Sequence, residues 1–239
     1  MHFLQKVRAE NFPEKIIWGW KDTFAVSILP LIVINGLILE KIFGTSIAVS
    51  LGDTILRGVL FILVCCLYKD MLFRHWKKYQ QAFWRSSILV VVGAICLQVI
   101  ISLTRQFLPL YESHEQRPFI DPEQIAFLSL LLISFGPLFT ALLEDIVFRY
   151  TLLQKLFIQP WLWRMILIML NSILFGLIHY HNFDGNLVAT ISFMSAGLFL
   201  NLIYLCTRNI WHVLLIHFLN NAVLSVGGIL LLKLIQTFT

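Results

Sequence analysis

The chain has 239 residues, of which 59% are hydrophobic and 13% are charged, whereas soluble domains carry about 25% charged residues. This composition and a mean hydropathy of +0.82 exclude an ordinary soluble domain and predict an integral, multi-pass membrane protein whose partner is the lipid bilayer. The formal net charge of +5 does not indicate a nucleic-acid partner, because the basic residues flank apolar segments, where membrane orientation explains them.

Seven apolar segments follow one another along the chain, and no linker divides them. We therefore expect one domain over residues 1–239 with an all-α fold, a polytopic bundle of about seven or eight transmembrane helices. The segments cover residues 24–43, 54–68, 86–108, 124–157, 161–180, 187–206 and 210–235.

Basic residues between these segments predict the orientation. With the N-terminus inside, thirteen Lys and Arg residues lie on the inner side and five on the outer side, so a cytoplasmic N-terminus is favoured. Between the second and third segments, residues 69–85 combine basic and aromatic side chains, which predicts an amphipathic stretch on the inner surface. The outer five are Lys41, Arg57, Arg105, Arg117 and Lys233.

The fourth segment is too long for one straight crossing, since its thirty-odd residues would extend roughly 50 Å as a helix. Asp121-Pro122-Glu123 has the pattern of a helix start. Gly136-Pro137 predicts a kink or break within the segment, which is why an eighth helix is possible.

Five polar residues of the last four segments fall at one depth. At about 1.5 Å per helical residue, they lie roughly 13–22 Å from the inner face, in the middle of a core about 30 Å thick. Such residues are costly in lipid and usually serve a function. They are Glu144, Asp145, His179, His217 and Asn221.

Spacing separates the roles of the two acids. Asp145 precedes Arg149 by four residues, the favourable order for a helical ion pair, whereas Glu144 points about 100° away and has no local cation. A structural alternative is that both acids and Arg149 form an interhelical salt-bridge cluster.

The histidines lie at helical spacing from possible partners. His217 and Asn221 share one helical face, as do Phe175 and His179, so Phe175 offers His179 an apolar wall. An isolated histidine is more often a packing residue, and only the combination of polar residues at one depth favours function.

This set suits hydrolysis of an acyl bond by activated water. Glu144 would take a proton from water, His179 would steer the water or donate to the leaving amine, and His217 and Asn221 would stabilise an oxyanion. No cofactor is required, although Glu144, His179 and His217 are also a possible three-ligand zinc site.

The second half of the chain contains motifs that resemble those of the CPBP family of intramembrane proteases, which includes the type II CAAX prenyl endopeptidase and bacterial Abi proteins. Residues 144–149 resemble its Glu-Glu-x-x-x-Arg motif, residues 175–179 its Phe-x-x-x-His motif, and residues 217–221 its His-x-x-x-Asn motif. Residues 207–211 resemble the Thr-Gly-Asn-Leu-Trp approach to the third motif. The chain departs from the pattern at Asp145, usually Glu, and at Tyr150, where Gly is common.

The resemblance implies an intramembrane endopeptidase whose catalytic core covers about residues 124–235 and whose substrate is a membrane-associated peptide or protein. It implies that Glu144 is the base, His179 its partner, and His217 and Asn221 the groups that stabilise the transition state, supported by Asp145. We expect a bacterial plasma membrane, where related proteins process peptides or confer bacteriocin immunity. The alternatives are a catalytically silent scaffold or self-immunity protein, and a proton-coupled transporter that uses Glu144 and His179 as a relay.

Overall fold

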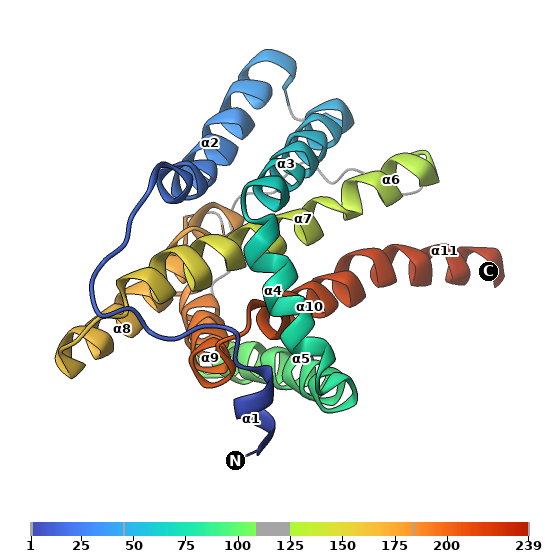
Figure 1. Ribbon diagram of the computed structural model, residues 1–239. Helices are drawn as coiled ribbons and strands as arrows, with labels where there is room; N and C mark the ends of the chain where they lie inside the picture. The colour runs from blue at the N-terminus through green and yellow to red at the C-terminus, as the bar shows by residue number, and fades with distance from the viewer. Residues whose placement is uncertain (1, 45, 109–124, 184, 239) are drawn as a thin grey trace.

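The computed structural model describes residues 2–44, 46–108, 125–183 and 185–238, and these residues form helices and no strand (Figure 1). The all-α prediction is therefore confirmed. The helices are α1 (His2–Val7), α2 (Trp20–Phe43), α3 (Ile47–Leu67), α4 (Lys69–Gln80), α5 (Phe83–Gln106), α6 (Phe127–Ser134), α7 (Gly136–Asp145), the π-helix η2 (Ile146–Gln154), α8 (Trp161–Leu177), the 3₁₀ turn η3 (Tyr180–Phe183), α9 (Ile191–Thr207), α10 (Ile210–Ala222), the π-helix η4 (Val223–Gly227) and α11 (Gly228–Phe238).

Five helical stretches are long and apolar enough to cross a membrane, and α8 and α9 are shorter apolar helices. Together they account for the seven expected segments. Large apolar side chains on these helices are exposed at the molecular surface, as expected for a protein that lipid surrounds. The long stretches are Trp20–Phe43, Ile47–Leu67, Phe83–Gln106, Phe127–Gln154 and Ile210–Phe238.

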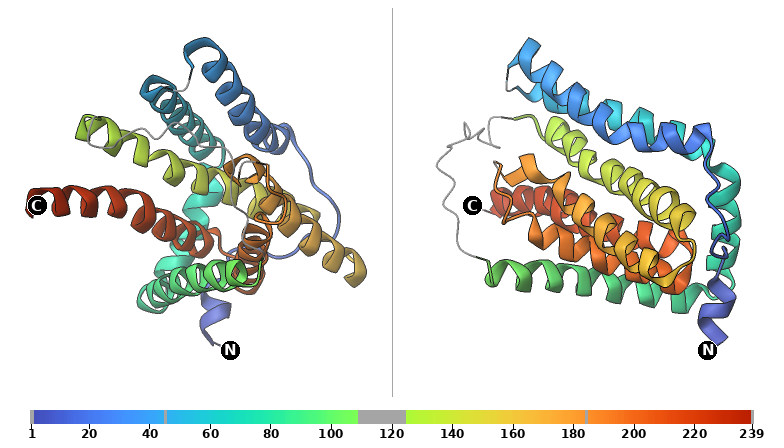
Figure 2. Two further views of the ribbon diagram at one scale, coloured as in Figure 1. Left: turned by 180° about the vertical axis from the view of Figure 1, so that it is seen from behind. Right: turned by 90° about the vertical axis from the view of Figure 1, so that its left-hand side faces the viewer.

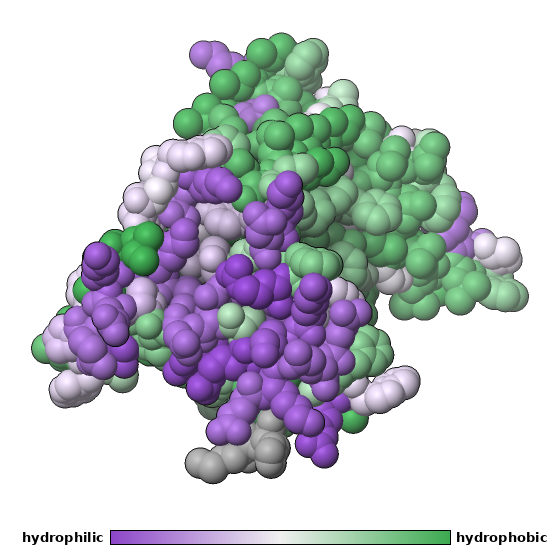
Figure 3. Space-filling view, in the orientation of Figure 1, coloured by the Kyte–Doolittle hydropathy of each residue, from purple (hydrophilic) through white to green (hydrophobic). Residues whose placement is uncertain are grey.

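The membrane helices run between two different ends of the molecule. One end carries a surface that we call the α4 face, which is formed by α4, residues 8–19 and the adjoining ends of α8, α9 and α10. Helix α11 ends at the opposite side of the molecule (Figure 2, right). Hydrophilic residues gather on the α4 face, while the helices that extend away from it are mostly hydrophobic outside (Figure 3). Helix α10 lies centrally, packed against α5, α7 and α9.

Helix α4 has the amphipathic character expected from the sequence. Its buried residues Met71, His75 and Tyr79 recur every four residues along one face. His75 accepts a hydrogen bond at Nδ1 from the backbone N–H of Ile210, the first residue of α10 (3.0 Å). The amphipathic helix thereby fixes the start of the central helix.

Helix α3 begins earlier than expected. Ser46 accepts a hydrogen bond from Val49 N–H and caps the helix, so α3 starts at Ile47 rather than at residue 54. Arg57, expected on the outer side, instead lies near the middle of α3. There its Nε pairs with Asp53 (2.6 Å) and it donates to Thr140 of α7, so neighbouring side chains compensate for its depth.

The long fourth segment breaks as expected beside Gly136-Pro137. Helix α6 ends at Ser134 and α7 starts at Gly136, with Pro137 in its first turn, where the missing N–H costs nothing. The helix start expected at Asp121-Pro122-Glu123 lies outside the described residues.

Helices α8 and α9 form the closest crossing next to the polar residues. A Cβ atom on Gly176 would lie 2.8 Å from Met194 N and 2.9 Å from Thr190 O, and one on Gly197 would lie 2.9 Å from the Phe175 ring. Only glycine permits this approach, which brings the end of α8 against the start of α9.

Candidate active site

The two acidic residues end α7 and are buried, Glu144 at 4% exposure and Asp145 at 0%. Asp145 Oδ1 lies 3.0 Å from Arg149 Nη1, and both side chains are fully buried. The contact is an ion pair without an aligned hydrogen bond. The structure therefore has the expected Asp145–Arg149 contact.

The π-helix η2 follows directly after the two acids and contains Arg149. Its wider turns leave backbone carbonyls that need other partners. Asn171 of α8 provides a partner for one of these carbonyls, because its Nδ2 donates to the carbonyl of Phe148 (3.0 Å). This bond ties α8 to the segment that carries the acids.

Glu144 faces His179 instead of a cation. Its Oε1 atom lies 3.9 Å from His179 Nε2, too far for a direct hydrogen bond. His179 Nδ1 lies 2.9 Å from the carbonyl of Phe175, so Nδ1 carries a proton and donates it there. In neutral imidazole, Nε2 is then an acceptor, and two acceptors face each other across the gap.

His179 does not lie within α8, although the expected segment continued through it. The helix ends at Leu177, and His179 occupies the turn before η3. Non-helical backbone at membrane depth is tolerated where it is enclosed by protein or lines a wet cavity. The His179 side chain is 12% exposed.

His217 of α10 faces the second acid. Its Nδ1 atom lies 3.3 Å from Asp145 Oδ2, although the two are not aligned as a hydrogen bond. The ring of Phe175 lies between the two histidines, 5.3 Å from His179 and 5.8 Å from His217 between ring centroids. The guanidinium of Arg149 lies 4.2 Å from the centre of the same ring.

Asn221 lies at the edge of this group. Its Nδ2 donates to the carbonyl of Pro137 (3.1 Å), and its Oδ1 accepts from Asn220 Nδ2 (3.2 Å). Asn221 thus connects α10 to the break between α6 and α7. Its second amide hydrogen remains the one suited to the expected oxyanion role.

Sequence reasoning missed Phe193, whose ring stacks on His179 with centroids 4.3 Å apart. Phe193 lies near the start of α9 without a motif around it, and only the glycine-mediated α8–α9 crossing brings it to His179. A phenylalanine in an apolar helix gives no sequence signal for this position.

The proposed zinc ligands do not form one donor set. Glu144 lies against His179, whereas His217 is turned to Asp145. Among the described residues, no three His, Cys, Asp or Glu side chains are grouped closely enough to hold a metal ion. The arrangement consists of two acid–histidine pairs, and it does not fit a three-ligand zinc site.

Residues 126–223 match the model of the family described as type II CAAX prenyl endopeptidase Rce1-like. This segment is therefore similar to the CAAX protease family. The four expected catalytic residues, Glu144, His179, His217 and Asn221, all lie within the match. No match was found among curated proteins or among solved structures. The similarity of this segment to CAAX proteases, together with the apolar spans, supports a protease of the membrane.

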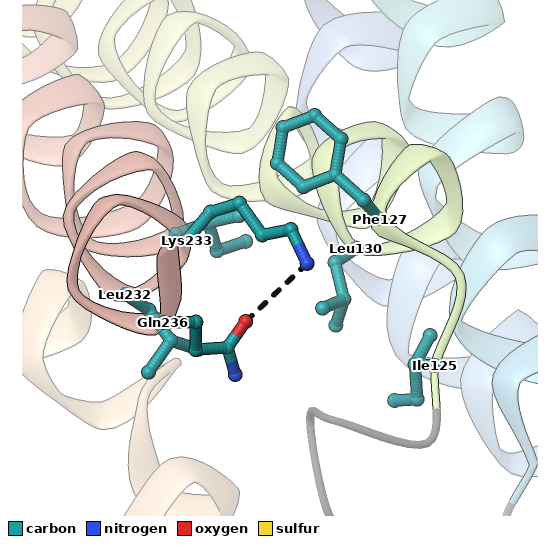
Figure 4. A pocket seen from close by; sticks show the side chains of 7 residues that line it. Ile125, Phe127, Leu130, Leu232, Lys233 and Gln236 are labelled. Atoms are coloured by element: carbon teal, nitrogen blue, oxygen red, sulfur yellow. Dashed lines mark hydrogen bonds between the residues drawn. The ribbon is translucent and has the colours of Figure 1, made fainter. Parts of the chain in front are cut away.

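A surface pocket lies elsewhere, between α6 and α11. Ile125, Phe127 and Leu130 line one side, and Lys233 on the other side donates to Gln236 Oε1 (3.4 Å) (Figure 4). None of the four candidate catalytic residues lines this pocket.

Proposed function

We propose that the protein is an intramembrane endopeptidase that hydrolyses a peptide bond with a water molecule held between Glu144 and His179. The supporting observation is the 3.9 Å separation of Glu144 Oε1 and His179 Nε2. With Glu144 as the carboxylate and His179 as the neutral imidazole, both atoms are acceptors, because His179 donates through Nδ1 to the carbonyl of Phe175. One water placed about 2.8 Å from each atom would give both of its hydrogens to them. Its lone pairs would then point away from the pair, toward a substrate carbonyl.

The reaction proceeds by proton transfer without an acyl-enzyme. The water oxygen attacks the scissile carbonyl carbon while Glu144 takes one water proton, and the carbonyl π electrons move to oxygen. When the tetrahedral intermediate collapses, the C–N bond breaks and protonated Glu144 returns the proton to the leaving nitrogen. His179 keeps the water oriented during the attack.

His217 is placed to stabilise the developing oxyanion. An imidazolium at this position would direct Nδ1–H to Asp145 and leave Nε2–H for the oxyanion. With Nδ1 facing Asp145, the Nε2–H of His217 is available to an oxyanion. Asp145 and Arg149 thereby act on His217 as positioning residues.

The substrate is a membrane-associated peptide or protein, because the candidate residues lie on helices of membrane-spanning composition. A soluble peptide would have to leave water to reach them. Attachment to the membrane raises the local concentration of the scissile segment.

Cleavage by purified protein tests the proposal. A library of quenched fluorescent peptides with an apolar anchor would be incubated with wild type, Glu144→Gln and His179→Gln in nanodiscs. We expect each variant to lose at least about 100-fold in kcat/KM, the usual contribution of a positioned acid or base. Glu14→Gln and His181→Gln make the same chemical changes elsewhere and should retain activity.

Three outcomes contradict the mechanism. Full activity of Glu144→Gln in cells and in vitro would favour a scaffold. Loss of activity with strong chelators, restored by zinc, would favour a metalloenzyme. Capture of an acyl-enzyme by hydroxylamine would show a covalent intermediate.

A further inference from the structure

Three arginines from different elements meet on the α4 face. Arg8 follows α1, Arg164 lies in the first turn of α8, and Arg208 ends α9. The guanidinium carbons of Arg208 and Arg164 lie 3.8 Å and 5.4 Å from the centre of the Phe12 ring. Arg8 is held close by its neighbour Ala9, whose N–H donates to the carbonyl of Arg208 (3.2 Å).

No acid neutralises these three charges within the described part of the chain. No ion pair there joins any of them to a carboxylate. The nearby acid Glu10 is already engaged by Arg74 and His75. Burial, and then the like charges of Arg8 and Arg164, lower the pKa of Arg208. The cation–π contacts with Phe12 offset part of the cost but supply no negative charge.

Each arginine has a shielded donor without a described partner. The Nε atoms of Arg8, Arg164 and Arg208 are all buried from solvent and make no hydrogen bond to a described residue. Buried donors of this kind usually have a partner, so three in one cluster indicate a missing acceptor. The three side chains themselves are only half-buried, which leaves the cluster accessible from the α4 face.

The backbone at Arg208 adds an independent observation. Arg208 adopts a left-handed conformation, with φ 48°, which costs a non-glycine residue about 1–2 kcal/mol. An arginine placed here against backbone preference indicates a use for its side chain.

We propose that Arg8, Arg164 and Arg208 form a binding site for a phosphate group at the α4 face. Guanidinium groups form paired N–H···O bonds with phosphate, and three of them suit its charge and its several acceptor oxygens. Trp161 and Trp163 lie next to Arg164 in the first turn of the apolar helix α8, and this position fits the headgroup of an anionic phospholipid or a free phosphate compound. This site is independent of the protease proposal, because it includes no candidate catalytic residue.

Ligand-dependent thermal stability of the purified full chain in neutral detergent tests the site. The probes are short-chain phosphatidylglycerol, short-chain phosphatidylcholine, inorganic phosphate and pyrophosphate, at matched ionic strength. We expect phosphatidylglycerol or pyrophosphate to bind wild type at least about tenfold more tightly than Arg164→Gln/Arg208→Gln, equivalent to one charge-assisted hydrogen bond. Lys69→Gln/Lys77→Gln, with the same charge change on exposed α4 residues, should bind as wild type does.

The different probes distinguish a lipid headgroup from a soluble phosphate compound. Binding of phosphatidylglycerol alone assigns the site to a lipid headgroup, and binding of inorganic phosphate or pyrophosphate assigns it to a soluble compound. If Arg164→Gln/Arg208→Gln folds poorly, Arg208→Lys is the second variant. It keeps the charge but lacks the planar guanidinium with its paired N–H donors, and it should weaken binding severalfold. Two results would overturn the proposal. One is an equal loss of binding affinity in Lys69→Gln/Lys77→Gln, and the other is no response of wild type to any of the phosphate-bearing probes.

Discussion

The Asp145–Arg149 pair is the most completely buried ionic contact of the site, with both side chains at 0% exposure. Removing one partner leaves the other charged and without compensation. We therefore expect Arg149→Gln to lower the free energy of unfolding by about 3–5 kcal/mol. Denaturation of the purified protein in mixed micelles measures this loss.

The Arg74–Glu10 pair is the matched comparison, since its Arg side chain is 52% exposed. Arg74→Gln should cost less than about 1 kcal/mol, because water solvates an exposed guanidinium almost as well as the carboxylate does. Equal losses for the two variants would contradict the account of the buried pair.

Local contacts of the site could be predicted from spacing, whereas contacts between helices could not. The four-residue interval between Asp145 and Arg149 is sufficient to predict their pair. The approach of His217 to Asp145 depends on the relative rotation of α7 and α10, which no interval along the chain specifies. The stacking of Phe193 on His179 has the same origin.

At the scale of elements, the α8–α9 crossing positions His179. A Cβ on Gly176 would approach backbone atoms of α9 to 2.8–2.9 Å, and backbone atoms cannot rotate away. Gly176→Ala should lower the free energy of unfolding by about 1–3 kcal/mol. It should also reduce kcat by up to about 100-fold, because His179 follows three residues later.

Gly36 is the control, because a Cβ there meets nothing within 4 Å and the residue also lies inside a helix. Gly36→Ala should leave both stability and kcat unchanged. If Gly176→Ala behaved in the same way, the close crossing would have no role in the site.

The contact between α4 and α10 predicts a pH dependence of stability. Burial lowers the pKa of His75 from its ordinary value of 6.5, and neutral Nδ1 accepts from Ile210 N–H. In the unfolded chain His75 binds a proton below about pH 6.5, whereas in the folded protein it remains neutral to lower pH. Stability should therefore fall as pH drops from about 6.5 toward 5. Thermal denaturation between pH 5 and 8 measures the slope.

Four charged or titratable groups face His75, namely Glu10, Arg74, Tyr150 and His212. Burial alone would raise the pKa of Glu10, but hydrogen bonds from His75 and Arg74 lower it below 4.5. The contribution of Glu10 to the free energy of unfolding therefore persists between about pH 5 and 6.5. His75→Asn keeps an acceptor for Ile210 without titrating, and its slope should be smaller. An unchanged slope would assign the dependence to another group.

Helix ends and helix types were the least predictable features of the elements. The break at Gly136-Pro137 follows from proline chemistry, and it was expected. The π-helices η2 and η4 were not, because tertiary contacts such as Asn171 to the Phe148 carbonyl stabilise the wider turn. Arg57 was placed outside the membrane because its compensating partner Thr140 lies on a distant segment.

At the scale of the whole molecule, the α4 face and the end of α11 lie on opposite sides (Figure 2, right). The excess of basic residues on the α4 face predicts that this face is cytoplasmic. In cells, an impermeant thiol reagent should label Lys233→Cys directly and Lys77→Cys only after permeabilisation. The four native cysteines, all free, would first be replaced by alanine. The reverse labelling pattern would refute the expected orientation.

The number and order of the membrane helices were predictable because apolar length alone specifies them. Their mutual rotation is set by side chains that meet only in the folded state, such as the glycines between α8 and α9. The sequence therefore predicts which residues can reach the middle of the bundle, and the fold decides which of them become partners.

The proposed mechanism requires one water between Glu144 and His179. An experimental structure at a resolution that reveals ordered water would show whether that water is present. We expect one water within hydrogen-bond distance of both Glu144 Oε1 and His179 Nε2, and we expect it to be absent in His179→Phe. A dry direct contact between the two side chains, or a His179 ring turned away from Glu144, would contradict it.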